Sequence, residues 1–366
     1  MALAAFQPAR LRHARMLRGM QQNELANDVG LTAAAISQFE SGAGVPRGDT
    51  LEHLAVVLGC LPAYFMRPLQ PGPSAEPFFR RRRASRKRDL GRAAAYAVIL
   101  SEIASCLERA VELPELRVQL TSRVDDTTPI LEIERIAIEV RESWGIQDGP
   151  LPNMVRLLEA GGVITAAVGT FDMVDAFSLR MTTRPVVVLC SDHGAAARRR
   201  FDAAHELGHL LMHETPLHAN KGQEDQAQRF AAALLMPAGQ IDPWLPRRSN
   251  DLSVLEEGSR TWGVSMQALL FRARILGAIS EDSYRRTQRR MSAAGWRTKE
   301  PVELGPAEAP ELLARAVLTL PEAGSSLEHV ADEIGLPRRR VARMLRVPEH
   351  ADDSTSGQVV QFRATG

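Results

Sequence analysis

The segment FDAAHELGHLLMH at residues 201–213 constrains the fold more than any other feature of the sequence. It contains H-E-x-x-H, and side chains four positions apart share one face of an α-helix. His205 and His209 can therefore present imidazole nitrogens to one Zn²⁺ ion at roughly 2.0–2.1 Å. Glu206 lies beside the metal, where it can accept a proton from a water molecule and later deliver it to a leaving amine. The pattern predicts a helix built for hydrolysis.

A third metal ligand must come from another segment. His213 continues the four-residue spacing, but it lies about 12 Å along the helix axis from His205, too far to share an ion. Glu224 is the better candidate, because it opens a second predicted helix over about 224–236. Apolar residues of that helix share its face: Ala227, Ala231 and Leu234. Two histidines and a glutamate leave one coordination position open, as in a catalytic zinc site.

The segments around this motif predict a mainly α fold with a small β-sheet, of the α+β class. Helices are expected over about 90–112 and 128–144, and the strand candidates are VITAAV, FSLRM and PVVVLC. The last strand, 185–190, directly precedes the motif helix. It could be an edge strand that pairs with an extended substrate, or a buried core strand, which its four consecutive apolar residues favour.

The N-terminal segment predicts short helices in a compact trihelical unit. In RLRHARMLRGMQQNELANDVGLTAAAISQFESG (10–42), Leu25, Ala26 and Val29 face inward on the second helix, and Gly30 ends it. Thr32 can cap the third helix. A helix over about 33–39 could then enter a DNA major groove.

This segment resembles the XRE-type helix-turn-helix family. The match lies in Gln22, Glu24-Leu25-Ala26, Gly30, Ile36-Ser37 and Glu40-x-Gly42. The resemblance implies phosphate contacts for Gln22 and Ser37. It implies positions near the bases for Ala33, Ala34 and Gln38, and Thr32 completes the predicted DNA-binding set. The alternative is a helical protein-interaction module that does not bind DNA.

Charge bears on that alternative. Residues 1–75 hold six basic and five acidic side chains, a weak balance for binding phosphates, and alanines offer at best methyl contacts to bases. The run FFRRRRASRKRDLGR (78–92) carries eight basic residues against one acid. It is a solvated linker or an arm that reaches phosphates.

Changes of composition divide the chain into four predicted parts. Residues 1–67 are the helix-turn-helix domain, 68–89 a proline- and arginine-rich linker, and 90–295 a zincin-like metallopeptidase domain. Residues 296–366 are a small helical region with a polar tail. Within it, SLEHVADEIGLPRRRVARML echoes a helix-turn-helix, so it is a packing or regulatory domain or a second DNA-binding element.

Several segments together resemble the ImmA/IrrE metallopeptidase family, which also occurs fused to an XRE-type unit. They are RRRFDAAHELGHLLMH, E-x-x-A-x-x-F-A-x-x-L-L-M-P, VDAFSLRMTTRPVVVL and VSMQALLFRARILGAIS. The resemblance implies that His205, His209 and Glu224 bind Zn²⁺ and that Glu206 is the base. It also implies cleavage of a cognate XRE-type repressor, which switches on genes of stress response or mobile elements. Self-cleavage, a sensor without turnover and an antitoxin that binds a partner stay open.

Bulk properties suggest the compartment and partners. Net charge is +1, no apolar run approaches the roughly 18 residues that span a bilayer, and the N-terminus has no long apolar core. The three cysteines form no C-x-x-C pair, so a thiolate zinc cluster is not expected. We expect a cytoplasmic protein that binds double-stranded DNA, with a homodimer as one option and no membrane partner.

Overall fold

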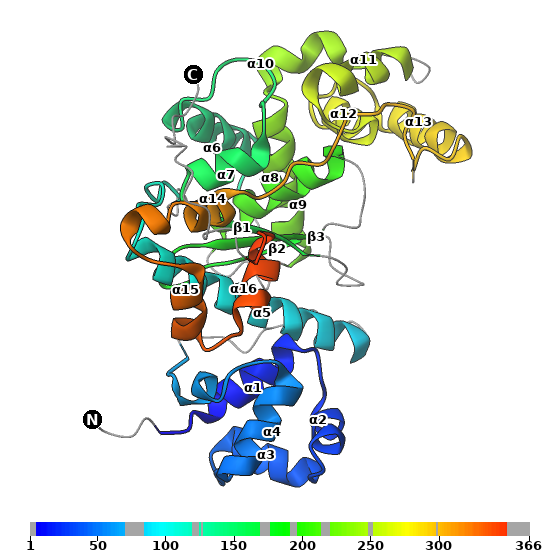
Figure 1. Cartoon of the computed structure of the whole chain (residues 1–366). Helices are drawn as coiled ribbons and strands as arrows, with labels where there is room; N and C mark the ends of the chain where they lie inside the picture. Colours follow the sequence, from blue (N-terminus) through cyan, green and yellow to red (C-terminus); the bar gives the residue numbers. More distant parts are fainter. Residues whose placement is uncertain are drawn as a thin grey trace.

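The computed structural model describes residues 5–69, 84–118, 124–125, 127–168, 176–190, 196–213, 220–247, 252–297 and 299–349. Helices dominate these residues, and three strands form one small sheet (Figure 1). The predicted α+β class, mainly α, is therefore confirmed. Among the described helices, none combines the length and apolarity needed to cross a membrane.

The N-terminal unit is a bundle of four helices followed by a 3-10 turn. Its elements are α1 (Pro8–Leu17), α2 (Gln22–Asp28), α3 (Ala33–Ser41), α4 (Gly48–Leu58) and η1 (Pro62–Met66). The predicted cap is confirmed, since the Thr32 hydroxyl accepts the backbone N–H of Ala35 at 3.2 Å. Leu11, Leu25 and Ile36 are fully buried between the helices. The unit thus has the compact core that its apolar spacing predicts.

The sheet has strand order β1–β3–β2, with bounds β1 (Ile164–Val168), β2 (Ala176–Leu179) and β3 (Val186–Cys190). β3 runs parallel to β1 and antiparallel to β2. The edge-strand interpretation of 185–190 is therefore wrong. Both sides of β3 are occupied by ladder hydrogen bonds, and its apolar run fits a central strand covered on both faces.

Alternate residues of β3 enter two different cores. Val186 and Val188 join the core that contains α5 (Ala84–Glu108), whereas Val187 and Leu189 join the core that contains α8 (Ala196–Met212). This follows from the two-residue period of a strand. The helices α7 (Met154–Ala160) and α8 pack on one face, and α5 and α14 (Leu312–Leu318) pack on the other.

The other helices extend these layers. The α8 side includes α6 (Ile130–Ser143), α9 (Lys221–Leu235), α10 (Ala238–Ile241), η3 (Asp242–Trp244), α11 (Leu252–Trp262), α12 (Met266–Ile275) and α13 (Glu281–Ala293). After α14 the chain forms η4 (Pro321–Ala323), α15 (Leu327–Ile334) and α16 (Arg338–Leu345). In Figure 1, α15 and α16 lie beside α5, between the sheet and the N-terminal unit.

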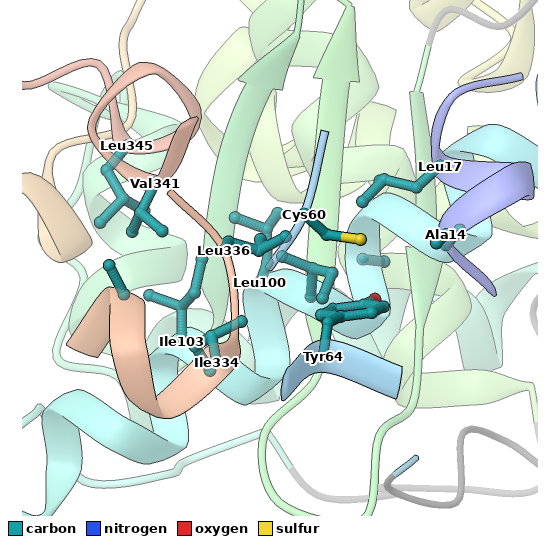
Figure 2. Packing of buried hydrophobic residues seen from close by; sticks show 14 of the residues in the cluster. Ala14, Leu17, Cys60, Tyr64, Leu100, Ile103, Ile334, Leu336, Val341 and Leu345 are labelled. Atoms are coloured by element: carbon teal, nitrogen blue, oxygen red, sulfur yellow. The ribbon is translucent and has the colours of Figure 1, made fainter. Parts of the chain in front are cut away.

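Helix α5 joins the N-terminal unit to the rest of the molecule. Figure 2 shows Leu100 and Ile103 of α5 packed among side chains of the N-terminal unit and of the C-terminal helices. One buried ion pair crosses this core: both terminal nitrogens of Arg10 donate to Glu102 at 2.8 Å, and the two side chains are 3% and 5% exposed. Arg10 also donates to the carbonyl groups of Arg67 and Pro68.

The C-terminal helices close on the N-terminal unit from the other side. The Arg340 guanidinium donates to the carbonyl oxygens of Leu58 and Gly59 at 2.8 and 2.6 Å, which satisfies the end of α4. Gly335, with φ of +78°, accepts the N–H of Leu61 at 2.9 Å. A side chain at that glycine would lie 2.8 Å from the Tyr64 backbone, so only glycine permits this approach.

The predicted helices near 90–112 and 128–144 correspond to α5 and α6, with α5 beginning at Ala84. The proline-rich segment from residue 70 and the arginine run up to residue 83 lie outside the described residues, as does the tail from residue 350. The four domain limits given above remain predictions.

The Arg10–Glu102 pair generates a test of this packing. Because Glu102→Leu leaves a buried guanidinium without its counter-charge, the free energy of unfolding should fall by about 3–5 kcal/mol. The double substitution Arg10→Met with Glu102→Leu should recover most of that loss, and chemical denaturation measures both. Glu132→Gln, which breaks an exposed pair with Arg135, should leave the free energy of unfolding nearly unchanged. If the single and double variants lose the same free energy of unfolding, the cost does not come from an unpaired Arg10 charge.

Candidate metal centre

The centre forms where α8 and α9 cross closely. A side chain added at Gly208 would lie 2.9 Å from the ring of Phe230 and 3.4 Å from the Cα of Ala227, so glycine allows the two backbones to approach. Asn220 caps α9 and places Glu224 in its first turn. The close packing brings that turn to the face of α8 that carries His205 and His209.

Three ligand atoms converge at this crossing. The Nε2 atoms of His205 and His209 are 3.0 Å apart, and the Glu224 carboxylate lies 3.4 Å from the first and 3.9 Å from the second. Ligand atoms of the three residues all lie within 4.8 Å of one another. The structure therefore brings together the three residues that the sequence suggested as metal ligands.

The spacing fits a tetrahedral divalent ion. With bonds of roughly 2.0–2.1 Å, two ligand atoms on a tetrahedral zinc ion are about 3.3 Å apart, which is close to the three separations found here. Both histidines are largely buried, whereas Glu224 is 45% exposed. The donor set of two imidazoles and one carboxylate suits Zn²⁺ and leaves room for a further ligand on the exposed side.

Glu206 is held beside the three ligands by the sheet. It is 7% exposed, and the Ser178 hydroxyl on β2 donates to its Oε2 atom at 2.6 Å. Burial raises the pKa of Glu206, although the charge of His205 and the hydrogen bond from Ser178 oppose the rise. A carboxyl group with a raised pKa is a better proton acceptor than an exposed glutamate.

A hydrogen-bond chain fixes the orientation and tautomer of His209. The Gln226 amide nitrogen donates to the backbone carbonyl of Asp125 at 2.6 Å, so its Oε1 faces Nε2 of His213 at 3.1 Å and must accept. Nδ1 of His213 is then the acceptor for Nδ1–H of His209 at 2.9 Å. That arrangement leaves the Nε2 lone pair of His209 directed at the metal position.

The pKa directions of the two histidine ligands differ. Burial, and the repulsion that a charged ring would meet from His205 and His213 when they are protonated, hold the pKa of His209 well below its usual range. Burial also lowers the pKa of His205, but the hydrogen bond to Glu224 and the nearby Glu206 carboxylate more than offset it. A histidine must be neutral to bind a metal, so His205 would release any proton it carries when the ion binds. The carboxylates of Glu224 and Glu206, which stabilise the protonated ring, would then face the positive ion.

The predicted DNA-binding residues lie in the N-terminal unit, away from the metal centre, and Figure 1 shows α3 at the end of this unit that is remote from the sheet. Five of them are exposed at the start and along one side of α3: Thr32, Ala33, Ala34, Ser37 and Gln38. Gln22 is half-buried at the start of α2, and its amide donates to Glu40 at 2.8 Å. Glu40 also binds Arg15. The contacts of these residues with DNA remain predictions.

Sequence reasoning missed the residues that support the centre. Ser178 belongs to a predicted strand, but no pattern within that strand marks a partner for Glu206. His213 is too far from His205 to share the ion, but its ring contacts the ligand His209. Gln226 lies two positions after Glu224 on α9. The apolar spacing of this helix indicates Glu224 as a ligand but gives no sign that Gln226 supports the centre.

Two comparisons with known families match the two parts of the chain. A helix-turn-helix model matches residues 11–65. The model of the IrrE N-terminal-like domain, a peptidase family, matches residues 170–274, which contain β2, β3 and the helices of the candidate centre. The two matches support a fusion of an XRE-type helix-turn-helix to an IrrE-like peptidase domain. Peptidases of that family typically depend on a metal. A search of curated proteins found no match.

The hydrogen-bond chain predicts a metal-affinity effect. Gln226→Leu keeps the size of the side chain but removes the acceptor for His213, so Zn²⁺ affinity should fall by about 10–100-fold. Competition with a chromogenic chelator measures that affinity. Nitrogen-15 spectra of the metal-free protein should also lose the single tautomer of His209.

Gln228→Leu on the exposed side of α9 is the matched control and should leave zinc affinity unchanged. His209→Ala should remove most of the bound zinc, because it deletes a ligand. If the folded Gln226→Leu variant keeps both its zinc affinity and its single His209 tautomer, the hydrogen-bond chain through His213 and Gln226 does not orient His209.

Proposed function

We propose that the chain is a DNA-binding regulator whose second part is a zinc metallopeptidase. Its substrate is a cognate XRE-type repressor or a segment of the chain itself, and the cleavage controls genes of stress response or mobile elements. The observation that carries the proposal is Glu206, a buried carboxylate held by Ser178 next to His205, His209 and Glu224. A centre that only senses or stores metal has no need of such a group.

The residues of the chain can divide the work of hydrolysis. A bound Zn²⁺ would polarise the peptide carbonyl and lower the pKa of a water molecule. Glu206 would accept the proton of the attacking water and deliver it to the leaving amine, and its raised pKa suits both transfers. Ser178 keeps the Glu206 carboxylate in one orientation. The hydrogen bonds that run from His213 through Gln226 to Asp125 keep His209 in place.

Glu206→Gln separates hydrolysis from sensing. It keeps the side-chain size and all three ligands but removes the proton acceptor, so cleavage should fall by at least roughly 10²-fold. Zinc content and DNA binding should stay unchanged. The assay is incubation of the zinc-loaded full chain with an XRE-type repressor encoded beside its gene, followed by mass spectrometry of the products.

Glu257→Gln on the exposed side of α11 is the matched control and should cleave normally. A Glu206→Gln protein that regulates its genes like the unmodified chain under inducing conditions would exclude proteolysis as the mechanism. The non-catalytic sensor or the partner-binding antitoxin would then be the function.

DNA binding through α3 can be tested with one exposed residue. Ser37→Glu puts a negative charge where the helix should meet phosphate, so affinity for a duplex from the upstream region of its own gene should fall at least about tenfold. Fluorescence anisotropy at low salt measures the affinity. Ser292→Glu on α13 is also exposed and should have no effect. If both variants bind like the unmodified chain, α3 is not the DNA-binding element.

A further inference from the structure

The helix-turn-helix unit has few basic side chains to offer to DNA. Of its basic residues, Arg10 is buried against Glu102 and Arg15 is bound to Glu40. Arg67 lies near Glu333 on the side of α15. A duplex carries about one negative charge per 1.7 Å of its axis, and each phosphate contact adds affinity through counterion release. Arg12, Arg18 and Arg47 are the exposed basic residues of the unit. Cations from other parts of the molecule would add to these three and strengthen binding.

Helix α5 places two arginines at the start of α2. A side chain added at Gly19, in the turn between α1 and α2, would lie 3.2 Å from Cδ of Arg92 and 3.8 Å from Nε of Arg88. Arg88 also reaches Glu24 of α2 at 3.1 Å, in a pair that is more than 40% exposed on both sides and hence weak. The same turn leads to Gln22, where a phosphate contact is predicted.

Helix α16 adds arginines from the far end of the chain. The Tyr96 hydroxyl on α5 donates to the Met344 carbonyl at 3.1 Å, which fixes α16 one turn along α5 from Arg92. Burial raises the pKa of Tyr96 to about 12, and the guanidinium of Arg346 is near enough to oppose that rise. Arg343 and Arg346 are both exposed at the end of α16.

Arg18 connects these two groups of arginines. It is exposed at the end of α1, next to Gly19. Burial lowers the pKa of Arg340 on α16, and the positive charges of Arg18 and Arg343 lower it further. Arg18 and Arg343 are therefore near enough to Arg340 for their charges to act on it, and an anion that binds at this place meets several positive charges.

We propose that Arg18, Arg92, Arg343 and Arg346, here called the arginine surface, bind the phosphate backbone of the duplex that α3 contacts. The inference rests on the proposed DNA binding and assigns a role to the C-terminal helices. Contacts to phosphates position a protein without reading sequence. The arginine surface therefore supplies affinity that the alanines at the start of α3 cannot.

The test uses the full chain with Arg343→Gln and Arg346→Gln together. Loss of two phosphate contacts should reduce the slope of log affinity against log salt by about 1.8, or roughly tens of fold in affinity near 0.1 M salt. The probes are the upstream duplex and a length-matched scrambled duplex, and the loss should be similar on both. Arg343→Lys with Arg346→Lys should retain most of the slope, because the charges remain.

The matched control is Arg286→Gln with Arg289→Gln, two exposed arginines on α13 at the opposite end of the molecule in Figure 1. It should bind like the unmodified chain, and thermal unfolding should show all variants folded. An unchanged slope in the α16 double variant, with normal binding by the unmodified chain, would overturn the arginine surface alone. No binding of either duplex by the unmodified chain would overturn the proposed DNA binding as well.

Discussion

The buried contact between Arg10 and Glu102 lies at the centre of this molecule, where the N-terminal unit packs on helix α5. Helix α5 is buried on most of its circumference, by α1 on one side, the sheet on another and the C-terminal helices on a third. Glu102 is a carboxylate inside that apolar environment, and it is tolerated there because Arg10 neutralises it in a bidentate pair. The N-terminal unit is consequently fixed to the sheet that carries Ser178, rather than attached only by its linker.

The sequence was most informative where function requires a fixed spacing within one helix. The separation of His205 and His209 depends on helical geometry alone, and it agrees with the convergence of their Nε2 atoms in the structure. The three helices predicted over residues 10–42 were equally accessible, since the cap at Thr32 and the apolar positions follow local rules. Glu224 could be suggested as the third residue because its helix has a clear apolar face.

Contacts between distant segments could not be predicted. The position of β3 at the centre of the sheet depends on which strands pair with it. Its four consecutive apolar residues indicate a buried strand, but they do not indicate which strands lie beside it. Ser178 faces Glu206 because alternate residues of β2 point to the face that α8 covers and because β2 pairs with β3 in the sheet. The burial of α5 on several sides removes the one-sided pattern that would reveal its partners, so the shared core in Figure 2 had no signal in the sequence.

The hydrogen bonds from Arg340 to the end of α4 also have a consequence during synthesis. The carbonyl groups of Leu58 and Gly59 obtain this donor only after a residue 282 and 281 positions later has left the ribosome. The N-terminal unit can form its helices early, but it reaches its final packing only after the peptidase-like part has been made. A ribosome that stops before α16 therefore releases an N-terminal unit in which the last carbonyl groups of α4 lack the Arg340 donor.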